Sequence, residues 1–276
     1  MKKGIDVSDN QGYIDWPRVK AAGVEFAIIR STRGSGNDDK QLASNIKGCV
    51  ECGIPFDFYK YRYSKTVQAA IEEARGVIAT LKKHGVMPSE DVVVWDDIED
   101  ASLLNLGKDA VLELAEVFRQ EIENAGYGYG LYMGQYAYEN KFYNEKFADD
   151  LWIARYYNGY NIMPLSANPN EKYKPVAYAG NLWGWQYTSS GRVDGINGNV
   201  DVNVSYYDIK ETEVEPSYYQ TPEFTLIDSL NKIGVDSSYN NRVAIALRNN
   251  IGNPYKGTAE QNMEMLRLLN EGKLLK

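Results

Sequence analysis

Three carboxylates in two short segments are the residues of this chain best suited to chemistry. Asp6 lies in the N-terminal segment Gly-Ile-Asp-Val-Ser, and Asp97 and Glu99 end an apolar run that begins at Val92. Side chains alternate along a strand, so Asp97 and Glu99 are expected on one face, within about 7 Å of each other. Two carboxylates that flank one bond are the groups needed for acid-assisted cleavage of a glycosidic linkage. The pattern favours such a site, and the alternative is a solvated acidic strand end.

The acids beside this pair are expected to face the other way. If Asp97 and Glu99 point into the fold's interior, Asp96 and Asp100 point away from it. Asp96 would then lie behind a buried strand and would need a partner among the helices, an Arg or a Lys. Strand alternation therefore separates Asp97, as a functional acid, from Asp96.

Two further acids lie near the ends of predicted strands. Asp6 closes the first strand, and Asp201 lies in the last one, inside the segment Gly-Asn-Val-Asp-Val-Asn. Active sites of barrels of parallel strands lie at the C-terminal ends of those strands, so both acids could face Glu99. Each could equally be an ordinary turn or helix-capping residue.

Aromatic side chains are frequent in and beside the predicted strands. Sugar rings have apolar faces that stack on aromatic rings, so a Tyr-lined cleft with carboxylates suits a polysaccharide. The aromatic candidates for substrate binding are Tyr59, Tyr61, Tyr132 and Trp152. The alternative is that a Tyr-rich barrel has such strands for packing alone, with half of the rings facing outward.

Strand-like and helix-like segments alternate over the first two hundred residues. The predicted strands are 3–7, 26–31, 55–61, 92–99, 129–133, 151–156, 182–187 and 200–204. The predicted helices are 16–22, 40–52, 67–84, 107–125 and 136–149. This order is typical of βα units and a mostly parallel sheet. We expect an α/β fold: an irregular (β/α) barrel of about five βα units plus three further strands, with a small helical C-terminal domain.

The composition changes near residue 210. Residues 210–222 are polar and acidic with two prolines, which indicates a linker between a barrel at 1–209 and a three-helix module at 223–276. A capping box at Thr258–Gln261 opens the last predicted helix. About 55 residues supply only a small core, so the module could bind a partner or form a homodimer.

Charge and composition exclude several classes of function. The formal net charge of −8 argues against nucleic acid and against an anionic membrane surface, and no run approaches the ~20 apolar residues of a membrane span. His84 is the only histidine, and Cys49 and Cys52 fall in a predicted helix. We therefore expect no metal and no organic cofactor. No apolar signal segment follows the N-terminal Met-Lys-Lys, so we expect synthesis in the cytoplasm without a signal peptide.

The order of these motifs resembles the family 25 glycoside hydrolases, the muramidases of bacteria, fungi and phages. The opening segment 4–16, the second strand 26–34 and the motif Asp97-Ile98-Glu99 match that family's pattern, as do segments 151–156, 185–187 and 195–203. The resemblance covers about residues 3–207. It implies cleavage of the β-1,4 bond from N-acetylmuramic acid to N-acetylglucosamine in bacterial peptidoglycan.

The resemblance also implies roles for individual residues. Glu99 takes the position of the proton donor, and Asp97 that of an ionised acid that assists the substrate's own acetamido group. Asp6 and Asp201 match two further acids of the cleft, and an inverting route in which either activates water stays open. Arg155 and Gln186, in the later strands, join the substrate-binding candidates. Departures from the family pattern are Arg30, Arg33 and the segment Tyr59-Lys60-Tyr61.

The tail is similar to short C-terminal modules of peptidoglycan hydrolases from Gram-positive bacteria and their phages, through Gly-Val-Asp-Ser-Ser at 234–238 and Tyr-Lys-Gly-Thr-Ala-Glu-Gln-Asn at 255–262. Together the segments favour a modular phage or prophage endolysin, or a host autolysin, that reaches the wall after release. One alternative is a glycan-binding protein on an inactive scaffold, against which the intact Asp97 and Glu99 argue. Another is a chitinase-like enzyme, whose longer acidic strand motif is missing.

Overall fold

The computed structural model describes residues 1–34, 36–141, 150–215, 218–219, 225–252 and 254–276. The chain forms two compact units, Met1–Val214 and Glu215–Lys276. No helix within the described ranges is both long enough and apolar enough to cross a membrane.

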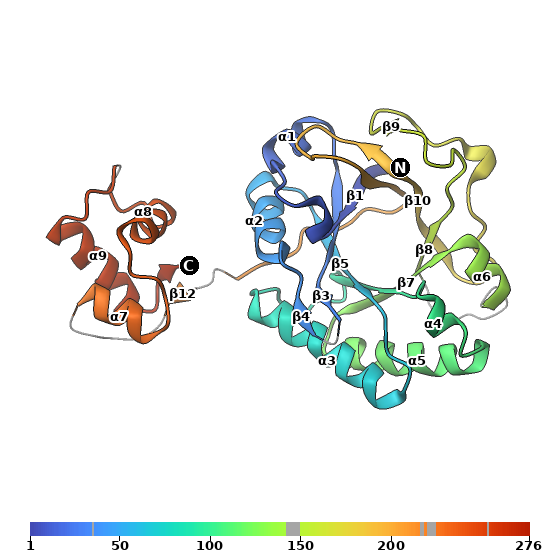
Figure 1. The fold of residues 1–276 in the computed structure, drawn as a ribbon, viewed down its shortest axis with the longest axis horizontal. Coiled ribbons are helices and arrows are strands. Elements are labelled where there is room, and N and C mark those ends of the chain that lie inside the picture. The colour runs from blue at the N-terminus through green and yellow to red at the C-terminus, as the bar shows by residue number, and fades with distance from the viewer. Residues whose placement is uncertain (35, 142–149, 216–217, 220–224, 253) are drawn as a thin grey trace. The chain divides into compact units, whose positions relative to one another are not determined.

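Eight strands of the first unit close into a barrel (Figure 1). They are β1 (Lys2–Val7), β2 (Phe26–Arg30), β5 (Phe56–Tyr61), β6 (Val93–Asp97), β7 (Gly128–Gly134), β8 (Asp150–Ala154), β10 (Asn181–Arg192) and β11 (Val200–Ser205). Neighbours from β1 to β10 pair in parallel, while β11 runs antiparallel to both β10 and β1 and closes the ring. The predicted irregular (β/α) barrel is confirmed.

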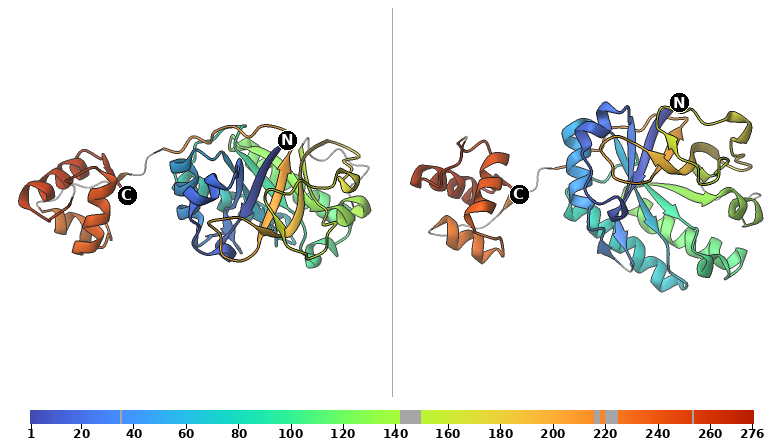
Figure 2. Two further views of the ribbon diagram at one scale, coloured as in Figure 1. Left: turned by 90° about the horizontal axis from the view of Figure 1, so that it is seen from above. Right: turned by 45° about the horizontal axis from the view of Figure 1, so that its top comes forward.

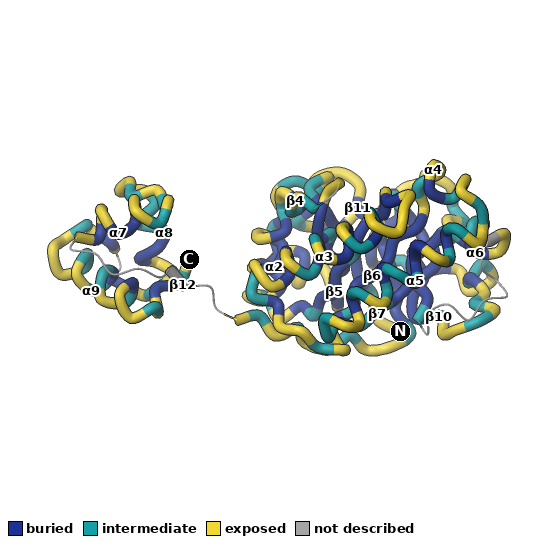
Figure 3. The backbone as a smooth tube through the Cα atoms, turned by 90° about the horizontal axis from the view of Figure 1, so that it is seen from below, coloured by how far each residue is buried: buried dark blue, intermediate teal, exposed yellow. Residues whose placement is uncertain are grey.

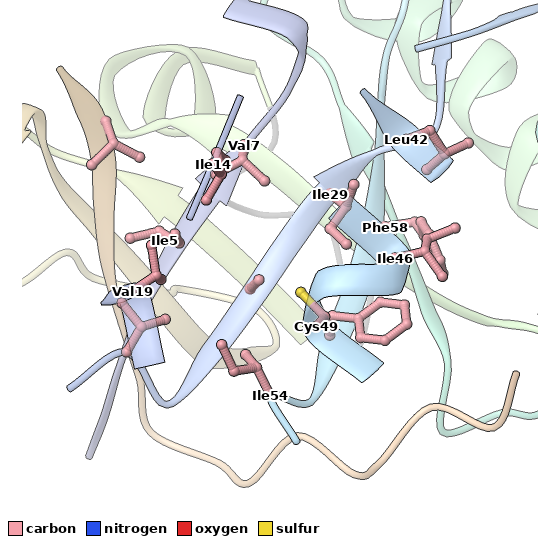
Figure 4. Close-up of a cluster of buried hydrophobic side chains, with 14 of the residues drawn as sticks. Ile5, Val7, Ile14, Val19, Ile29, Leu42, Ile46, Cys49, Ile54 and Phe58 are labelled. Carbon is pink, nitrogen blue, oxygen red and sulfur yellow. The ribbon is translucent and has the colours of Figure 1, made fainter. Parts of the chain in front are cut away.

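Helices cover the early strands, as the alternating pattern predicts. They are α1 (Trp16–Ala21), α2 (Leu42–Cys52), α3 (Val67–Lys83), α4 (Ala101–Leu104), α5 (Lys108–Asn124) and α6 (Gln135–Lys141). Residues 142–149 of the last predicted helix lie outside the described residues. Figure 2 shows the helices around the strands. In Figure 3, the strands are mostly buried, and the helices alternate between buried and exposed residues. In the hydrophobic cluster of Figure 4, Ile46 and Cys49 of α2 pack with Ile29 and Phe58 of the sheet.

Between β8 and β10, short elements take the place of a long helix: β9 (Met163–Pro164), which pairs with the end of β10, and the 3-10 turn at Glu171–Tyr173. Two more short elements lie near the start of the chain. A 3-10 turn at Asp9–Gln11 follows β1, and the hairpin of β3 (Thr32–Arg33) and β4 (Asn37–Asp38) follows β2. β6 ends at Asp97, two residues earlier than the predicted strand, because Asp100 already caps α4. Glu99 therefore lies in the loop between β6 and α4.

Large aromatic side chains fill the inside of the barrel. The cluster contains Phe26, Ile28, Trp95, Tyr132, Trp152 and Trp183. Glycines opposite these rings make the room: a Cβ on Gly130 would lie 2.4 Å from the Trp95 ring, and one on Gly4 would lie 2.4 Å from the Phe26 ring. The interior is thus a packed, water-poor floor beneath the ends of the strands.

The second unit is built from α7 (Leu226–Lys232), α8 (Tyr239–Arg248) and α9 (Ala259–Asn270). A short antiparallel pair, β12 (Tyr218–Tyr219) with β13 (Leu274–Leu275), joins its two ends. The capping box of Thr258 and Gln261 is present at the start of α9. The segment just before this unit packs on the barrel, since Lys210 pairs with Asp91 at 2.6 Å and Val214 forms a β-bridge with Val86.

Asp57 of β5 is a buried acid in the barrel interior, and it makes the stability of the first unit depend on pH. It accepts hydrogen bonds from the backbone N of Val93 (3.0 Å) and from Nε1 of Trp95 (3.4 Å). Burial raises the pKa of Asp57 to about 7. The folded state therefore holds this proton where the unfolded chain, with a pKa near ~3.9, has lost it.

We expect the free energy of unfolding to fall as pH rises from about 4 to about 7, with Asp57 contributing at most about 4 kcal/mol of the decline. Asp57→Asn keeps an acceptor and cannot ionise, so its melting temperature should fall less over this range. Calorimetry at intervals between pH 4.5 and 8 measures both curves. Parallel curves for the two proteins would contradict this account of Asp57.

Candidate active site

A cavity of about 280 Å³ opens at the C-terminal ends of the parallel strands and contains all four predicted acids. Asp6 comes from β1, Asp97 from the end of β6, and Glu99 from the loop after it. Asp201 lies near the start of the antiparallel β11, directly opposite Asp6 in the register of the two strands. The topology thus brings together four carboxyl groups that the sequence spreads over almost two hundred residues. We call this space the acid cavity.

The predicted binding residues surround the same space. Tyr59, Tyr61, Tyr132, Trp152 and Gln186 line the acid cavity. Arg155 lines an adjoining hollow of about 490 Å³, which shares Glu99, Tyr132 and Tyr156 with the acid cavity. The acid cavity also includes Asn10, Arg30 and Tyr63, which were not among the predicted binding residues.

Asp6 is the acid with the best-defined hydrogen-bond donors. Its Oδ2 accepts from Nε2 of Gln186 (2.9 Å) and from Nδ2 of Asn203 (2.8 Å). The Gln186 amide is oriented by its own carbonyl, which accepts from the hydroxyls of Tyr132 (2.7 Å) and Tyr156 (2.6 Å). Burial raises the pKa of Asp6 to about 6, and these donors oppose the shift. Of the four acids, Asp6 therefore has the hydrogen-bond donors that best stabilise a negative charge.

Asp97 and Glu99 have fewer donors and more like-charged neighbours. Burial raises the pKa of Glu99, with Asp6 and Asp100 adding to the shift. Burial also raises the pKa of Asp97 well above its usual range, with Glu99 and Asp6 next in effect. Asp201, buried beside Asp6 and Glu99, has its pKa raised to about 8. The free site therefore holds protons near neutral pH, and Asp97 does not differ from Glu99 in the direction of its shift.

One oxygen in the acid cavity is conspicuously unsatisfied. Oδ1 of Asp97 is buried and has no hydrogen-bond partner among the described residues. Leaving a buried polar atom unpaired costs free energy, so such an atom in a cavity is a place where a ligand can donate a hydrogen bond.

Behind the site, a buried ionic network holds the strand that carries Asp97. Asp96 accepts two hydrogen bonds from Nη1 of Arg62, both at 2.9 Å, and one from the Tyr129 hydroxyl at 3.1 Å. Nε of Arg62 also contacts Glu73 of α3 at 3.0 Å, and its guanidinium lies 4.2 Å from the centre of the Phe118 ring on α5. Asp96 thus faces away from the acid cavity. Its partner is an Arg, as expected, but one that follows β5 and does not come from a helix.

Similarity to known proteins covers most of the barrel, from within β1 to the segment before β11. The family model described as glycosyl hydrolases family 25 matches residues 5–196. An autolytic lysozyme of Clostridium acetobutylicum is 27% identical over 203 residues, which is 73% of this chain and 55% of that protein.

Two solved structures are similar at comparable identity. The catalytic domain of the endolysin ply40 from bacteriophage P40 of Listeria monocytogenes matches with a TM-score of 0.63 and 28% identity, over 76% of this chain and 95% of that one. The modular autolysin LytC of Streptococcus pneumoniae, solved with a synthetic peptidoglycan ligand, matches with a TM-score of 0.61 and 28% identity, over 74% of this chain and 46% of that one. The chain thus spans about half the length of LytC and of the clostridial lysozyme.

The opposite facing of two neighbouring acids gives a direct test. Asp97→Asn should lower glycoside hydrolysis at least about 100-fold and should not lower the melting temperature, because it removes a crowded, unpaired carboxyl group. Asp96→Asn should retain most activity in the folded protein but lose about 3–5 kcal/mol of stability, because Arg62 loses its buried counter-charge. Thermal unfolding and a reducing-end assay of glycan hydrolysis measure the two effects. A folded Asp96→Asn protein without activity, beside an active Asp97→Asn protein, would reverse the assignment.

Proposed function

The chain belongs to glycosyl hydrolase family 25, and on that basis we propose that it cleaves the β-1,4 bond between N-acetylmuramic acid and N-acetylglucosamine of bacterial peptidoglycan. The observation that carries the proposal is the acid cavity itself, in which Glu99 and the unsatisfied Asp97 face one space at the barrel mouth. A binding protein would have no use for two buried, poorly solvated carboxyl groups with raised pKa values.

Glu99 is the proton donor in this proposal. It lines both the acid cavity and the adjoining hollow, so a glycosidic oxygen between two sugars that occupy these spaces would lie beside it. Burial and the charge of Asp6 raise the pKa of Glu99, which favours the protonated carboxyl group that a proton donor needs. Glu99 then gives its proton to the leaving oxygen as the bond to C1 breaks.

Asp97 serves the sugar on the other side of that bond. The N–H of a 2-acetamido group would donate to the unpartnered Oδ1, and this hydrogen bond would lower the pKa of Asp97 and favour its ionised form. The acetamido oxygen, made more nucleophilic, forms a bond to C1 as the glycosidic bond breaks. Water then attacks C1, its proton passes to Glu99, and the acetamido group is released. The products are two shorter glycans with the elements of water added.

The network around Asp6 fits a positioning role in the same site. Asp6 is fixed by Gln186 and Asn203, and it faces Asp201 across the β1–β11 pair. If the reaction inverted configuration at C1, Asp6 or Asp201 would instead activate the water. The anomer formed first, observed by proton NMR before mutarotation, distinguishes the two routes.

The second unit adds a wall-binding role to the proposal. Its sequence resembles C-terminal modules of peptidoglycan hydrolases, and its helices have their own core around Leu230, Ile245 and Met265. We propose that it anchors the enzyme on the wall after release, in the manner of a phage or prophage endolysin or a host autolysin. A homodimer formed through this unit is the alternative.

Glu99→Gln should lower hydrolysis by about 10²–10⁴, because the isosteric amide removes only the transferable proton. Digestion by the unmodified protein should create new muramic acid reducing ends, detected by borohydride reduction and sugar analysis. Reduced glucosamine ends would indicate a glucosaminidase, and new amino termini would indicate an amidase or peptidase. A Glu99→Gln protein that keeps a third of the turnover would remove Glu99 from the mechanism.

Removing residues 215–276 should leave a folded barrel that still cuts soluble glycan fragments but clears intact walls poorly. The cut follows Val214, because the residues before it pack on the barrel. Tethering to an insoluble substrate can add about 10²–10⁴ in avidity without any change in the chemistry. Sedimentation and wall pull-down compare the full chain with the truncated one. A dimer that becomes monomeric on truncation, with no loss of wall binding, would favour the dimerisation alternative.

A further inference from the structure

A second hollow, of about 530 Å³, adjoins the acid cavity and shares none of its described lining residues with the hollow that Arg155 lines. It shares Arg30, Tyr61 and Tyr63 with the acid cavity, so the two spaces are continuous. The hairpin of β3 and β4 forms one wall. We call this space the cationic hollow, after the side chains that line it.

Positive charge dominates the lining of the cationic hollow. Arg30, Arg33 and Lys40 line it, and Asp38 is the one acid among its described lining residues. Asp38 is already engaged from behind, by Nζ of Lys83 at 2.8 Å and by Nε2 of His84 at 2.9 Å. Three cationic side chains and one acid that is already paired thus line the space, in a protein whose net charge is −8.

The two arginines are held in place before any ligand arrives. Arg30 pairs with Asp9 and, at 2.6 Å, with the buried Asp39. Nη1 of Arg33 pairs with Asp9 at 2.9 Å, while its side chain stays 46% exposed. Lys40 is exposed and forms no ion pair within the described part of the chain. Arg33 and Lys40 thus keep donors available to a ligand.

The wall of the hollow also presents an unsatisfied hydroxyl. Oγ1 of Thr32, a residue only 1% exposed, has no hydrogen-bond partner among the described residues, and Thr32 lines the space. The hairpin that carries it is fixed from below, because Nζ of the buried Lys60 donates to the carbonyl of Gly34 at 2.6 Å. A buried hydroxyl without a hydrogen-bond partner, beside cations that are held in place, can donate a hydrogen bond to an anionic ligand.

We propose that the cationic hollow binds a carboxylate carried by the wall glycan, through Arg33, Lys40 and the Thr32 hydroxyl. This inference rests on the proposed function. Muramic acid bears a lactyl ether whose carboxyl group is either free or extended by a peptide with carboxylates of its own, so every second sugar offers an anion. Phosphate of an anionic wall polymer shares this chemistry, and the experiment separates the two sources.

The test uses the full-length chain, the double variant Arg33→Gln/Lys40→Gln and a matched control, Lys47→Gln. Lys47 is an exposed lysine of α2 that pairs with Glu51 and lines neither cavity. One substrate is peptide-free glycan strands with free lactyl carboxylates, and the second is the same strands after carbodiimide coupling of those groups to methylamine. KM and kcat are measured for each combination.

On strands with free carboxylates, the double variant should raise KM about threefold to tenfold, with kcat nearly unchanged, and the control should match the unmodified protein. On neutralised strands, the unmodified protein should show the same rise, and the double variant should add nothing further. Thr32→Val should raise KM on the charged strands alone. Equal losses on charged and neutral strands, or no loss on either, would overturn the proposal.

Two further arms separate the possible sources and the possible failures. Treatment with hydrofluoric acid removes phosphate polymers from walls. If this treatment abolishes the difference between the unmodified protein and the double variant, and neutralising the carboxylates does not, the ligand is phosphate. The carboxylate assignment would then be wrong. Calorimetric titration of the Glu99→Gln protein with peptide-free strands measures binding without turnover. Binding that weakens when Arg33 and Lys40 are replaced supports the cationic hollow even if product analysis shows that a different bond is cut.

Discussion

The burial of four carboxyl groups in one cavity is the constraint around which the first unit is arranged. Burying an unpaired charge is costly, and burying several together is more so. Two features of the structure reduce this cost in free energy. The structure supplies amide donors from Gln186 and Asn203 to Asp6 alone, and these donors oppose the rise in the pKa of Asp6 to about 6. The pKa values of Asp97, Glu99 and Asp201 are also raised, which favours their protonated forms. Asp6 is thus the acid whose negative charge the surrounding donors stabilise best.

The aromatic interior beneath the cavity makes this arrangement possible. Trp95 and Trp152 exclude water from the floor, and each indole N–H is directed to a polar group, Asp57 in one case and Asn203 in the other. Trp152 therefore orients the amide that donates to Asp6, and the packing of the barrel is tied to the electrostatics of the site. Gly130 is part of the same arrangement, because any side chain there would displace Trp95.

Much of the fold and the acid set could be predicted from the sequence, because strand alternation and the alternation of β and α segments are local patterns. Alternation places Asp97 inside and Asp96 outside, as the structure does. The identity of Asp96's partner could not be predicted, since Arg62 reaches it only through the pairing of β5 with β6. Glu99 was placed in the strand because its spacing fits, but the cap that Asp100 provides to α4 ends β6 earlier. The cationic hollow depends on the path of the hairpin after β2, for which the sequence has no periodic signal.

The distribution of charge along the joined cavities bears on how one bond is chosen over another. A glycan of alternating sugars contains two kinds of β-1,4 bond, and a cleft that recognised only the sugar backbone would admit either next to Glu99. Only the muramic residues carry carboxylates, so a cationic site at a fixed distance from Glu99 stabilises one register of the chain and not the register shifted by one sugar. Arg30 makes that distance fixed: it ends β2, lines both the acid cavity and the cationic hollow, and is held by Asp39 at their junction. On the proposed function, charge placed beside the catalytic acids would then select the bond, and Glu99 and Asp97 would serve only the chemistry at C1.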